Sequence, residues 1–296
     1  MIHLPRLLFA TDGSDCAERA RVHAFDLAHR FDADLHVVHV EERDVELSDV
    51  IEIREADVLA DLHLPLPDDA PVPVSRVHEH TVVHRSAADG LLNYAAEHDT
   101  PLIVLGTHGR RGVQHLVLGS VAEEVVRRAP GPVLTVGRGA PASPPTDGPL
   151  LVPVDFSDHQ ERLLTHARLL AQAYEVSIAL LHVVNRADPP AAYETEQERP
   201  APDVLRDRST QALTEPAASL RDDGLDVQVE VRHGHPADEI LTAADDLDAA
   251  LLAIATHGRS GVERMLMGSV AETVIRRAPC PVFTVKSFGR SLVEEK

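Results

Sequence analysis

Two glycine-bearing turns, each followed by a Gly-Ser pair, are the parts of this chain best suited to chemistry. The first is Gly106–Gly109 (sequence GTHG), with Gly119-Ser120 nine residues further on. Glycines let a backbone approach a bulky anion and turn its amides toward it. A helix that begins at Ser120 adds free amides and the positive end of a helix dipole. The pattern predicts phosphate binding without a lysine, with Arg110 as an additional contact.

The same pattern occurs a second time, 149 residues later. Residues 107–136 and 256–285 are identical at 20 of 30 aligned positions. A repeat this long predicts two copies of one domain. The second copy supplies the equivalent residues Gly258, Arg259, Gly268 and Ser269.

A purely structural explanation of these residues stays open. Ser120 and Glu123 have the spacing of a helix capping box, and so do Ser269 and Glu272. Glycines after a strand also often do no more than permit a tight turn. Two other phosphate motifs do not fit. A P-loop needs a lysine after a glycine, and the dinucleotide fingerprint needs its glycines after the first strand, not the fourth.

Apolar runs of strand length alternate with helical periodicity through both halves of the chain. We expect strands at residues 7–10, 35–40, 74–84, 102–106 and 133–136, and again at 150–154, 176–184, 226–233, 250–255 and 282–285. We expect helices at 15–31, 89–97, 120–129, 158–174, 237–245 and 269–278, with partly helical charged stretches near 45–62 and 203–222. Such alternation predicts the α/β class, with parallel sheets covered by helices on both faces.

The length of 296 residues leaves room for two domains of ordinary size. The segment Gly137–Gly148 (GRGAPASPPTDG) is rich in Pro, Gly and Ala, which is typical of a linker. The expected domains are therefore residues 1–140 and 148–296, with a boundary near residue 143.

Two more repeated features follow strands that should neighbour the glycine turns. Asp12 and its counterpart Asp155 follow the first expected strand of each half. Val40 and its counterpart Val183, each preceded by a histidine, end the second strand. In open parallel sheets, ligands bind beyond the carboxyl ends of the strands. These residues and the glycine turns are therefore expected to meet at one edge of each sheet.

This combination of motifs resembles the universal stress protein family. The resemblance rests on the aspartate after strand 1, His-Val at the end of strand 2, and the long motif G-x2-G-x9-G-S, in this order in both halves. It implies a tandem protein whose two domains are each a five-stranded sheet in the order 3-2-1-4-5. That fold is Rossmann-like, of the adenine nucleotide alpha hydrolase type. It also implies an ATP site, since one branch of the family binds nucleotides.

The resemblance also assigns roles to individual residues. In the first half, Asp12 and Val40 would hold the adenine, Gly106 and Gly109 the ribose and phosphates, and Gly119 and Ser120 the phosphates. In the second half, the equivalent residues are Asp155, Val183, Gly258, Gly268 and Ser269. The implied ligand is ATP, with or without Mg²⁺.

The family also dimerises through its final strand. Residues 133–136 and 282–285 are edge strands of the same pattern, and an unpaired edge seeks a partner. The resemblance therefore implies an internal pseudo-dimer in which these two strands pair antiparallel. A homodimer of two chains is the further assembly to consider.

Each half departs from the family pattern once. The second half has Ala255 where the first has Gly106, which adds a methyl group where the backbone should approach the ligand. The first half has Arg85-Ser86-Ala87 where the second has Gly234-His235-Pro236. The two sites are therefore not expected to be equivalent.

No catalytic constellation is apparent. The sequence has neither a repeated cysteine nucleophile nor a G-x-S-x-G elbow. We interpret His108 and His257, inside the motif, as turn-stabilising side chains, so any ATP hydrolysis should be slow. His78, His80 and His84 share one strand face by alternation, which we interpret as a solvated edge strand, not a metal site.

The chain is strongly acidic, with a net charge of −20 and only two lysines. This composition indicates adaptation to a salty cytosol, although a GC-rich genome would produce a similar bias. The charge disfavours binding to nucleic acid or anionic membranes. Two cysteines at non-equivalent positions fit a reducing cytoplasm. We expect neither a signal peptide nor a membrane span.

Three functions fit these observations. The leading hypothesis is a cytoplasmic stress-response module in which ATP occupancy biases conformation or partner choice. The second is an interaction protein that binds no nucleotide and whose glycine turns are structural. The third is an enzyme, a weak ATPase or an adenylate-forming relative, which the missing phosphate-binding lysine and the missing nucleophile disfavour.

Overall fold

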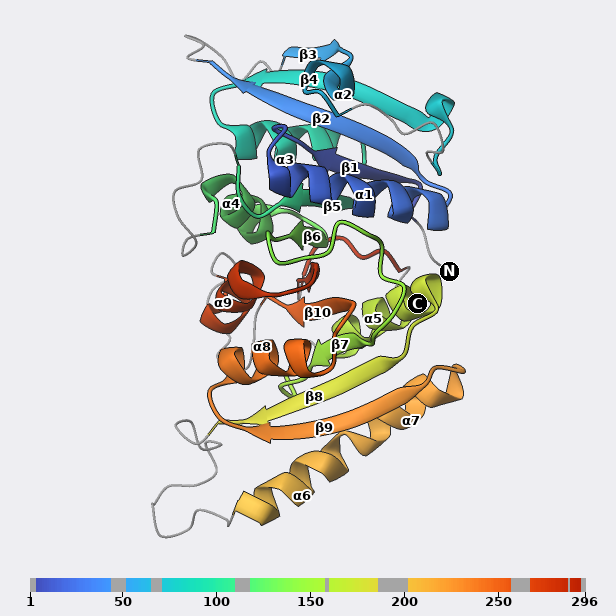
Figure 1. The fold of residues 1–296 in the computed structure, drawn as a ribbon, viewed down its shortest axis with the longest axis vertical. Coiled ribbons are helices and arrows are strands. Elements are labelled where there is room, and N and C mark those ends of the chain that lie inside the picture. The colour runs from blue at the N-terminus through green and yellow to red at the C-terminus, as the bar shows by residue number, and fades with distance from the viewer. Residues whose placement is uncertain are drawn as a thin grey trace.

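The structure is a computed structural model that describes residues 4–43, 52–64, 71–109, 118–157, 160–185, 202–256, 267–286 and 288–293. Figure 1 shows two lobes stacked along the long axis, with the N-terminal half in blue and green above the C-terminal half in yellow and red. The lobes meet where the final strand of each half lies, so the molecule has the two-domain form expected from the repeat.

The first half contains, in chain order, β1 (Arg6–Ala10), α1 (Asp15–Arg30), β2 (Asp34–Glu42), β3 (Glu52–Glu55), α2 (Val58–Asp61), a 3-10 turn (Val74–Arg76), β4 (Val77–His84), α3 (Ala87–Glu97), β5 (Leu102–Gly106), α4 (Ser120–Arg128) and β6 (Val133–Val136). The second half contains β7 (Leu150–Pro153), α5 (Gln160–Tyr174), β8 (Ile178–Val184), α6 (Pro202–Ala212), α7 (Thr214–Asp222), β9 (Val227–His233), α8 (Pro236–Asp246), β10 (Leu251–Ala255), α9 (Ser269–Arg277) and β11 (Val282–Val285).

One eleven-stranded sheet runs through both halves in the order β3-β4-β2-β1-β5-β6-β11-β10-β7-β8-β9. Neighbours within β4-β2-β1-β5-β6 are parallel, and so are neighbours within β9-β8-β7-β10-β11. Apart from β3, each half therefore has the order 3-2-1-4-5, and the predicted fold class is confirmed. The antiparallel pair β6–β11 joins the two halves, as expected.

Two expected segments differ from the structure. The stretch 45–62 was expected to be partly helical, but Glu52–Glu55 forms strand β3, antiparallel to β4, and only Val58–Asp61 is helical. Residues 45–51 lie outside the described residues. Ile53 packs against the core while its neighbours are charged, so this short alternating stretch suits an edge strand. The stretch 203–222 is two helices, because Pro216 disrupts a continuous helix at Leu213.

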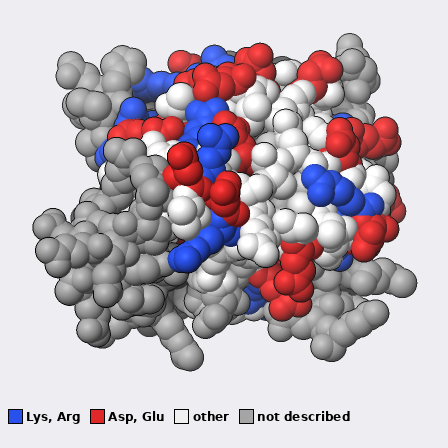
Figure 2. Space-filling view, turned by 90° about the horizontal axis from the view of Figure 1, so that it is seen from below, with Lys and Arg blue, Asp and Glu red and all other residues white. Residues whose placement is uncertain are grey.

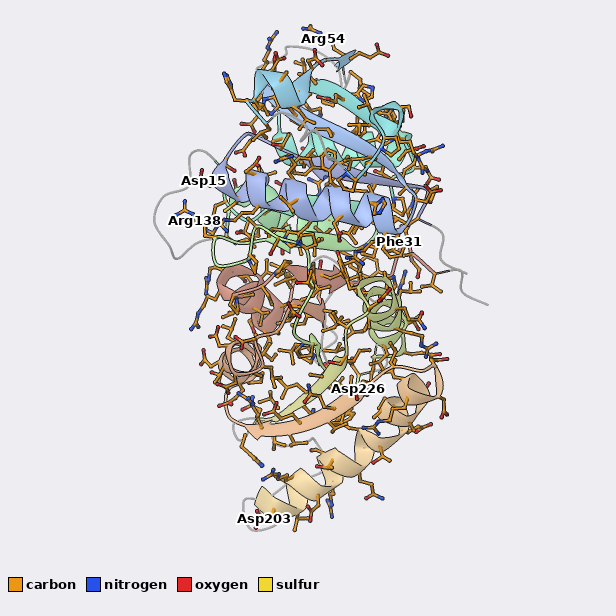
Figure 3. All side chains as sticks on the ribbon, turned by 45° about the vertical axis from the view of Figure 1, so that its right-hand side comes forward. Asp15, Phe31, Arg54, Arg138, Asp203 and Asp226 are labelled. Atoms are coloured by element: carbon orange, nitrogen blue, oxygen red, sulfur yellow. The ribbon has the colours of Figure 1, made fainter. Side chains whose placement is uncertain are left out.

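Helices cover both faces of the sheet. The core on one face contains residues of α1, α2, α5 and α7, and the core on the other contains residues of α3, α4, α8 and α9. Strand residues alternate between the two cores, with Leu7 of β1 in the first and Leu8 in the second. Figure 3 shows α1 crossing its face of the sheet from Asp15 to Phe31.

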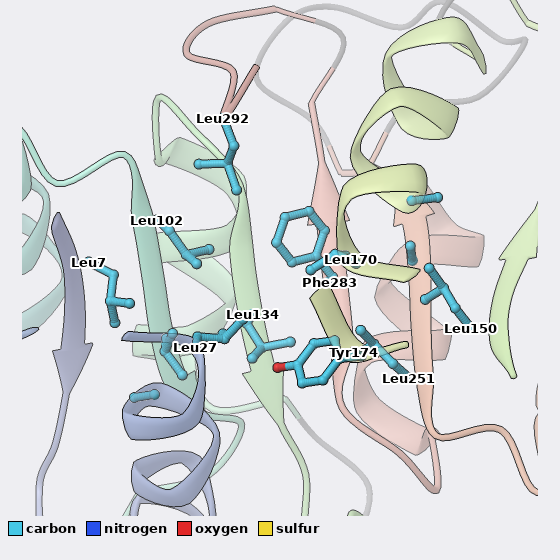
Figure 4. Close-up of a cluster of buried hydrophobic side chains, with 14 of the residues drawn as sticks. Leu7, Leu27, Leu102, Leu134, Leu150, Leu170, Tyr174, Leu251, Phe283 and Leu292 are labelled. Carbon is cyan, nitrogen blue, oxygen red and sulfur yellow. The ribbon is translucent and has the colours of Figure 1, made fainter. Parts of the chain in front are cut away.

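The two halves share part of a core at the β6–β11 junction. Leu27 and Leu134 from the first half and Leu170, Tyr174 and Phe283 from the second belong to one buried cluster (Figure 4). Unfolding either half would expose this apolar surface, so each half stabilises the other.

The segments that follow the final strands are also fixed. His23 Nε2 of α1 donates to the Pro141 carbonyl at 3.1 Å, and His166 Nε2 of α5 accepts from Leu292 N at 3.2 Å. Ala140, within the expected linker, is fully buried. The first part of the stretch Gly137–Gly148 is therefore packed against α1 at Ala140 and Pro141.

Candidate functional site

The loop after β1 places Asp12 at the carboxyl edge of the sheet. Ser14 N donates to Asp12 Oδ1 at 3.0 Å, which makes a tight turn over Gly13. The second half repeats this turn, with Ser157 N donating to Asp155 Oδ1 at 3.0 Å. The two predicted adenine-binding aspartates therefore occupy the same local geometry.

The middle residue of this turn differs between the two halves. Gly13 has φ 72°, in the left-handed region that suits glycine, whereas Phe156 adopts φ 58° at the equivalent place. A bulky side chain is rare there. The Phe156 ring packs 4.5 Å from the His182 ring, so the second half has an aromatic group where the first has none.

The histidines at the ends of the second strands tie this edge together. His39 Nδ1 donates to the Thr11 carbonyl at 2.8 Å, and His182 Nδ1 donates to the Val154 carbonyl at 2.7 Å. Val40, the residue after His39, is half-buried. The histidine of each His-Val pair is thus structural and places the valine beside the aspartate turn.

The glycine turn after β5 lies against the Asp12 turn. A Cβ on Gly109 would come within 2.6 Å of Asp12 Oδ2. Ser14 Oγ donates to the His108 carbonyl at 3.1 Å and joins the two loops. The structure therefore brings together Asp12 and Gly109, which are 97 residues apart in the chain. Ser14 was missed in the sequence, although the repeated Asp-x-Ser could have revealed it.

Gly106 has a packing role. A Cβ there would lie 2.7 Å from the Cys16 carbonyl carbon and 2.8 Å from Ala17 N, so the first turn of α1 requires a glycine. Its expected contact with ribose and phosphates stays a prediction. The equivalent position in the second half, Ala255, carries a methyl group within the sheet.

The capping-box explanation of Ser120 and Glu123 is wrong. The N-cap of α4 is Gly119, Ser120 is the first helical residue, and no side chain caps the helix. The second half agrees, with Gly268 as the N-cap of α9 and no side-chain cap. The hydroxyl groups of Ser120 and Ser269 therefore stay available on exposed residues.

The start of α4 is held close to the glycine turn by its backbone. Gly119 N donates to the Thr107 carbonyl at 2.9 Å, and Gly268 N donates to the Thr256 carbonyl at 2.9 Å. A Cβ on Gly119 would lie 2.8 Å from the Thr107 oxygen, which explains the glycine. Helix geometry leaves the next amides, beginning with Ser120, without an intrahelical acceptor. These amides and the positive end of the helix dipole form an anion-binding arrangement.

His108 stabilises the turn. Its ring is largely buried, and Nδ1 lies 2.9 Å from Thr107 Oγ1.

Four residues named in the sequence analysis lie outside the described residues: Arg110, His257, Gly258 and Arg259.

The histidines of β4 do not form a solvated edge, so this interpretation is wrong. β3 pairs with β4 over residues 80–83, so β4 is not the outermost strand. His80 packs against Tyr94 and His98, while His84 binds the Ser86 backbone at the other end of the strand. Within the residues that the structure describes, no group of three or more His, Cys, Asp or Glu side chains could hold a metal ion.

The chain belongs to the universal stress protein family. The family profile matches twice, at residues 4–137 and 148–286, so this is a tandem member. Universal stress protein MJ0531 of Methanocaldococcus jannaschii is 31% identical over 138 residues, which cover 46% of this chain and 81% of the relative.

Solved structures share the fold. A universal stress protein from Archaeoglobus fulgidus has a TM-score of 0.65 and 21% identity, and the match covers 96% of this chain and 99% of that one. A second universal stress protein from Archaeoglobus fulgidus was solved in complex with dAMP, with 26% identity, a TM-score of 0.35 and coverage of 47% of this chain and 98% of that one. None of the described helices is long and apolar enough to cross a membrane.

Proposed function

We propose that this chain is a cytoplasmic, ATP-binding regulatory protein of the stress response, whose principal nucleotide site is in the first half. The observation that carries the proposal is the start of α4. A glycine occupies the N-cap, so among the described residues no N-cap side chain bonds the free amides at this end of the helix, which suits an anion. Glycine at an N-cap costs only a few tenths of a kcal/mol relative to a capping side chain, so the helix keeps its stability while its first amides stay open to an anion.

The first-half residues fit an adenine nucleotide. Asp12 and the half-buried Val40 flank the adenine position, with a carboxylate to accept from an amino group and an apolar side chain to contact the base. The Gly109 backbone lies so close to Asp12 that any side chain would intrude on the cradle. The Ser120 amide, the amides that follow it in the first turn and the Ser120 hydroxyl would bind phosphate oxygens, and Gly119 would let the backbone approach them. Arg110 would add a charge contact, and Mg²⁺ would accompany the phosphates.

The second half is proposed as the weaker site. Asp155, Val183, Gly268 and Ser269 keep the arrangement of the first half, with Gly258 and Arg259 assigned by the repeat alone. Phe156 brings an aromatic ring to this edge and narrows the space beside His182.

The chain is proposed to hold ATP and not to turn it over at an appreciable rate. Nδ1 of His108 contacts Thr107 Oγ1 and the ring is largely buried in the turn, so we do not assign it as a base for an attacking water. Occupancy of the site would instead fix the loops after β1 and β5 and the start of α4 in one arrangement. A partner protein would recognise this arrangement of the loops.

The rival function is an interaction protein without a nucleotide. One observation favours it, since close packing against Cys16 and Ala17 explains Gly106 without a ligand. Packing against the Thr107 carbonyl also accounts for Gly119. It accounts less well for Gly268, where a Cβ would lie 3.3 Å from the Thr256 carbonyl oxygen, so the glycine N-cap of α9 favours the nucleotide.

Isothermal titration with ATP and Mg²⁺ at about 2 M KCl tests the proposal, because it reports both affinity and sites per chain. We expect binding, with the tighter site lost in Gly109→Val, whose branched side chain would displace Asp12 from the cradle. Circular dichroism of the variant should show an intact fold. Absence of heat in the parent, or unchanged affinity in Gly109→Val, would favour the interaction protein.

A further inference from the structure

Four histidines of the first half cluster around one buried tyrosine, and two of them contact its hydroxyl group. Tyr94 of α3 is fully buried, and its Oη lies 2.8 Å from His36 Nδ1 of β2 and 2.8 Å from His80 Nδ1 of β4. His98 stacks on Tyr94 with ring centroids 3.9 Å apart, and His78 lies 5.1 Å from His36. We call these five residues the histidine cluster.

The fold does not require this cluster, because the second half lacks it. The strand register and the equal lengths of α3 and α8 identify the equivalent positions. In the order His36, His78, His80, Tyr94, His98, the second half has Ala179, Gln228, Glu230, Ala243 and Leu247. The same architecture is thus built with no histidine or tyrosine at these places, and the cluster needs another explanation.

Proton chemistry fits the cluster better than metal chemistry does. In the part of the chain that the structure describes, these histidines do not form a group of three or more ligands that could hold a metal ion. The Nδ1 atoms of His36 and His80 already face the same hydroxyl group. A hydroxyl group donates only one hydrogen, so one of these imidazoles accepts it through an unprotonated Nδ1 while the other donates to the oxygen, and the accepting ring is neutral. Protonation of both rings would leave the Tyr94 hydrogen without its acceptor and would place two charges beside it.

The surroundings oppose protonation. Burial and the neighbouring histidines hold the pKa of His36 at about 4, below the usual 6.5, and burial also lowers the pKa of His80. Burial raises the pKa of Tyr94 well above its usual value, so a phenolate does not form to balance added charge. The other charged groups that act on the cluster are Arg6 of β1, which disfavours charge on His36, and Glu55 of β3, which favours it on His80.

Helix α3 connects the cluster to the candidate nucleotide site. Tyr94 and His98 lie at its C-terminal end, and Gly90 in its first turns lies against Val40. A Cβ on Gly90 would be 3.1 Å from Val40 Cγ1 and 3.1 Å from His84 Cβ, so the helix is in close contact with this part of the sheet. A shift of α3 would therefore move the wall behind Val40.

We propose that the histidine cluster is an acid-sensitive latch, which holds α3 against the sheet while its imidazoles are neutral and releases the helix when they are protonated. Release would open the Val40 side of the first-half site and weaken nucleotide binding. This second effect rests on the proposed function, whereas the latch itself does not.

The direction of the effect follows from linkage. A released or unfolded α3 lets His36 titrate near 6.5, whereas the packed helix holds it at about 4. Between these values the released form binds more protons, so the packed form loses stability as pH falls through this window. At about pH 5.5 the opening equilibrium of α3 should be about tenfold more favourable than above pH 7.5 from His36 alone.

Hydrogen exchange of the intact chain, followed by mass spectrometry at about pH 7.5 and about pH 5.5 in about 2 M KCl, tests the latch. After correction for the intrinsic exchange rate, peptides from α3 should lose about tenfold protection at the lower pH. Peptides from α8 are the internal control and should keep theirs. Equal losses in α3 and α8, or no loss in α3, would overturn the latch.

The double variant His36→Asn/His80→Asn is the matched control. Asparagine places an amide near the position of Nδ1 but does not titrate, so α3 should be equally protected at both pH values.

ATP titrations should show a loss of affinity at low pH in the parent that exceeds the loss in this variant. If α3 opens with acid but ATP binds at neither pH, the latch stands and the proposed function fails. If ATP binds while α3 stays protected, the latch fails alone. If the variant does not fold, the comparison of α3 with α8 in the parent decides.

Discussion

Leu134 in β6 pairs with Phe283 in β11, and each is the counterpart of the other in the sequence repeat. The hydrogen bonds around this pair are also equivalent. Thr135 Oγ1 donates to the Val282 carbonyl at 3.3 Å, and Thr284 Oγ1 donates across in the other direction at 3.0 Å. The register is thus symmetric about one residue pair. Both strands have partners on either side, so a homodimer would need another surface.

Truncation at this junction should weaken both halves together. Phe283 is fully buried, so Phe283→Ala should lower the free energy of unfolding by about 3–5 kcal/mol. Chemical denaturation followed by circular dichroism should give a single transition in the parent, because the halves share this core. Two separate transitions in the parent, or a loss below about 1 kcal/mol in the variant, would show that the halves fold independently.

Gly106 and Ala255 form a matched pair for separating packing from ligand binding. Gly106→Ala would place a methyl group against the backbone of Cys16 and Ala17, which should cost about 1–3 kcal/mol in the absence of nucleotide. Ala255→Gly should cost only about 0.5–1 kcal/mol through chain entropy. Urea denaturation without ATP measures both. If Gly106→Ala is as stable as the parent, the glycine is not required for packing, and ligand binding would be the better explanation for it.

Lys286 should make stability depend on alkaline pH. It is 4% exposed, its Nζ donates to the Arg127 carbonyl near the end of α4 at 2.7 Å, and burial lowers its pKa from 10.5 to about 8. The unfolded chain binds this proton more tightly, so the penalty of burying the charge disappears as pH rises from about 8 to 10.5.

Comparison of the parent with Lys286→Met isolates this contribution, because every other titrating group is common to both. The free energy of unfolding of the parent minus that of Lys286→Met should increase between about pH 7.5 and about pH 10. A difference that stays constant with pH would show that Lys286 titrates normally.

The acidic composition should make the fold depend on salt. Figure 2 shows acidic and basic side chains interspersed on the end face of the second half. One surface ion pair of this half joins Arg168 and Asp223 at 2.8 Å. Such surface pairs contribute little, and the net charge of −20 leaves repulsion that ions must screen. The Tm should rise with KCl up to about 2 M, and NaCl should act alike. A Tm that does not change with salt concentration would indicate that the acidic composition reflects genome bias.

Repetition and strand periodicity made most of the fold predictable. The turn at Asp12 followed from the sequence, whereas the strand order and the β6–β11 pairing were implied by the family resemblance that the motifs of both halves carry. Features present in only one half were missed or misread. β3 is four residues long, too short for a periodic signal, and the histidines of β4 resembled a solvated face because their partners, Tyr94 and His98, lie on a separate helix.

The candidate site shows a different limit. Spacing could not show whether Ser120 is the N-cap or the first helical residue, because the two cases differ only by a shift of one residue in where the helix begins. It also could not reveal that Gly106 faces α1, since that contact depends on how closely a helix packs on the sheet.

The most direct test of the nucleotide site is a charge placed at the start of α4. A carboxylate at a helix N-terminus stabilises the helix by about 0.3–1 kcal/mol, but it repels a phosphate at the same place. Ser120→Asp should therefore keep or raise the Tm while weakening the tighter ATP site at least about tenfold in isothermal titration. Ser269→Asp, at the same place in the second half, should leave that site unchanged. If Ser120→Asp binds ATP as tightly as the parent does, no phosphate lies at the start of α4 and the proposed site is wrong.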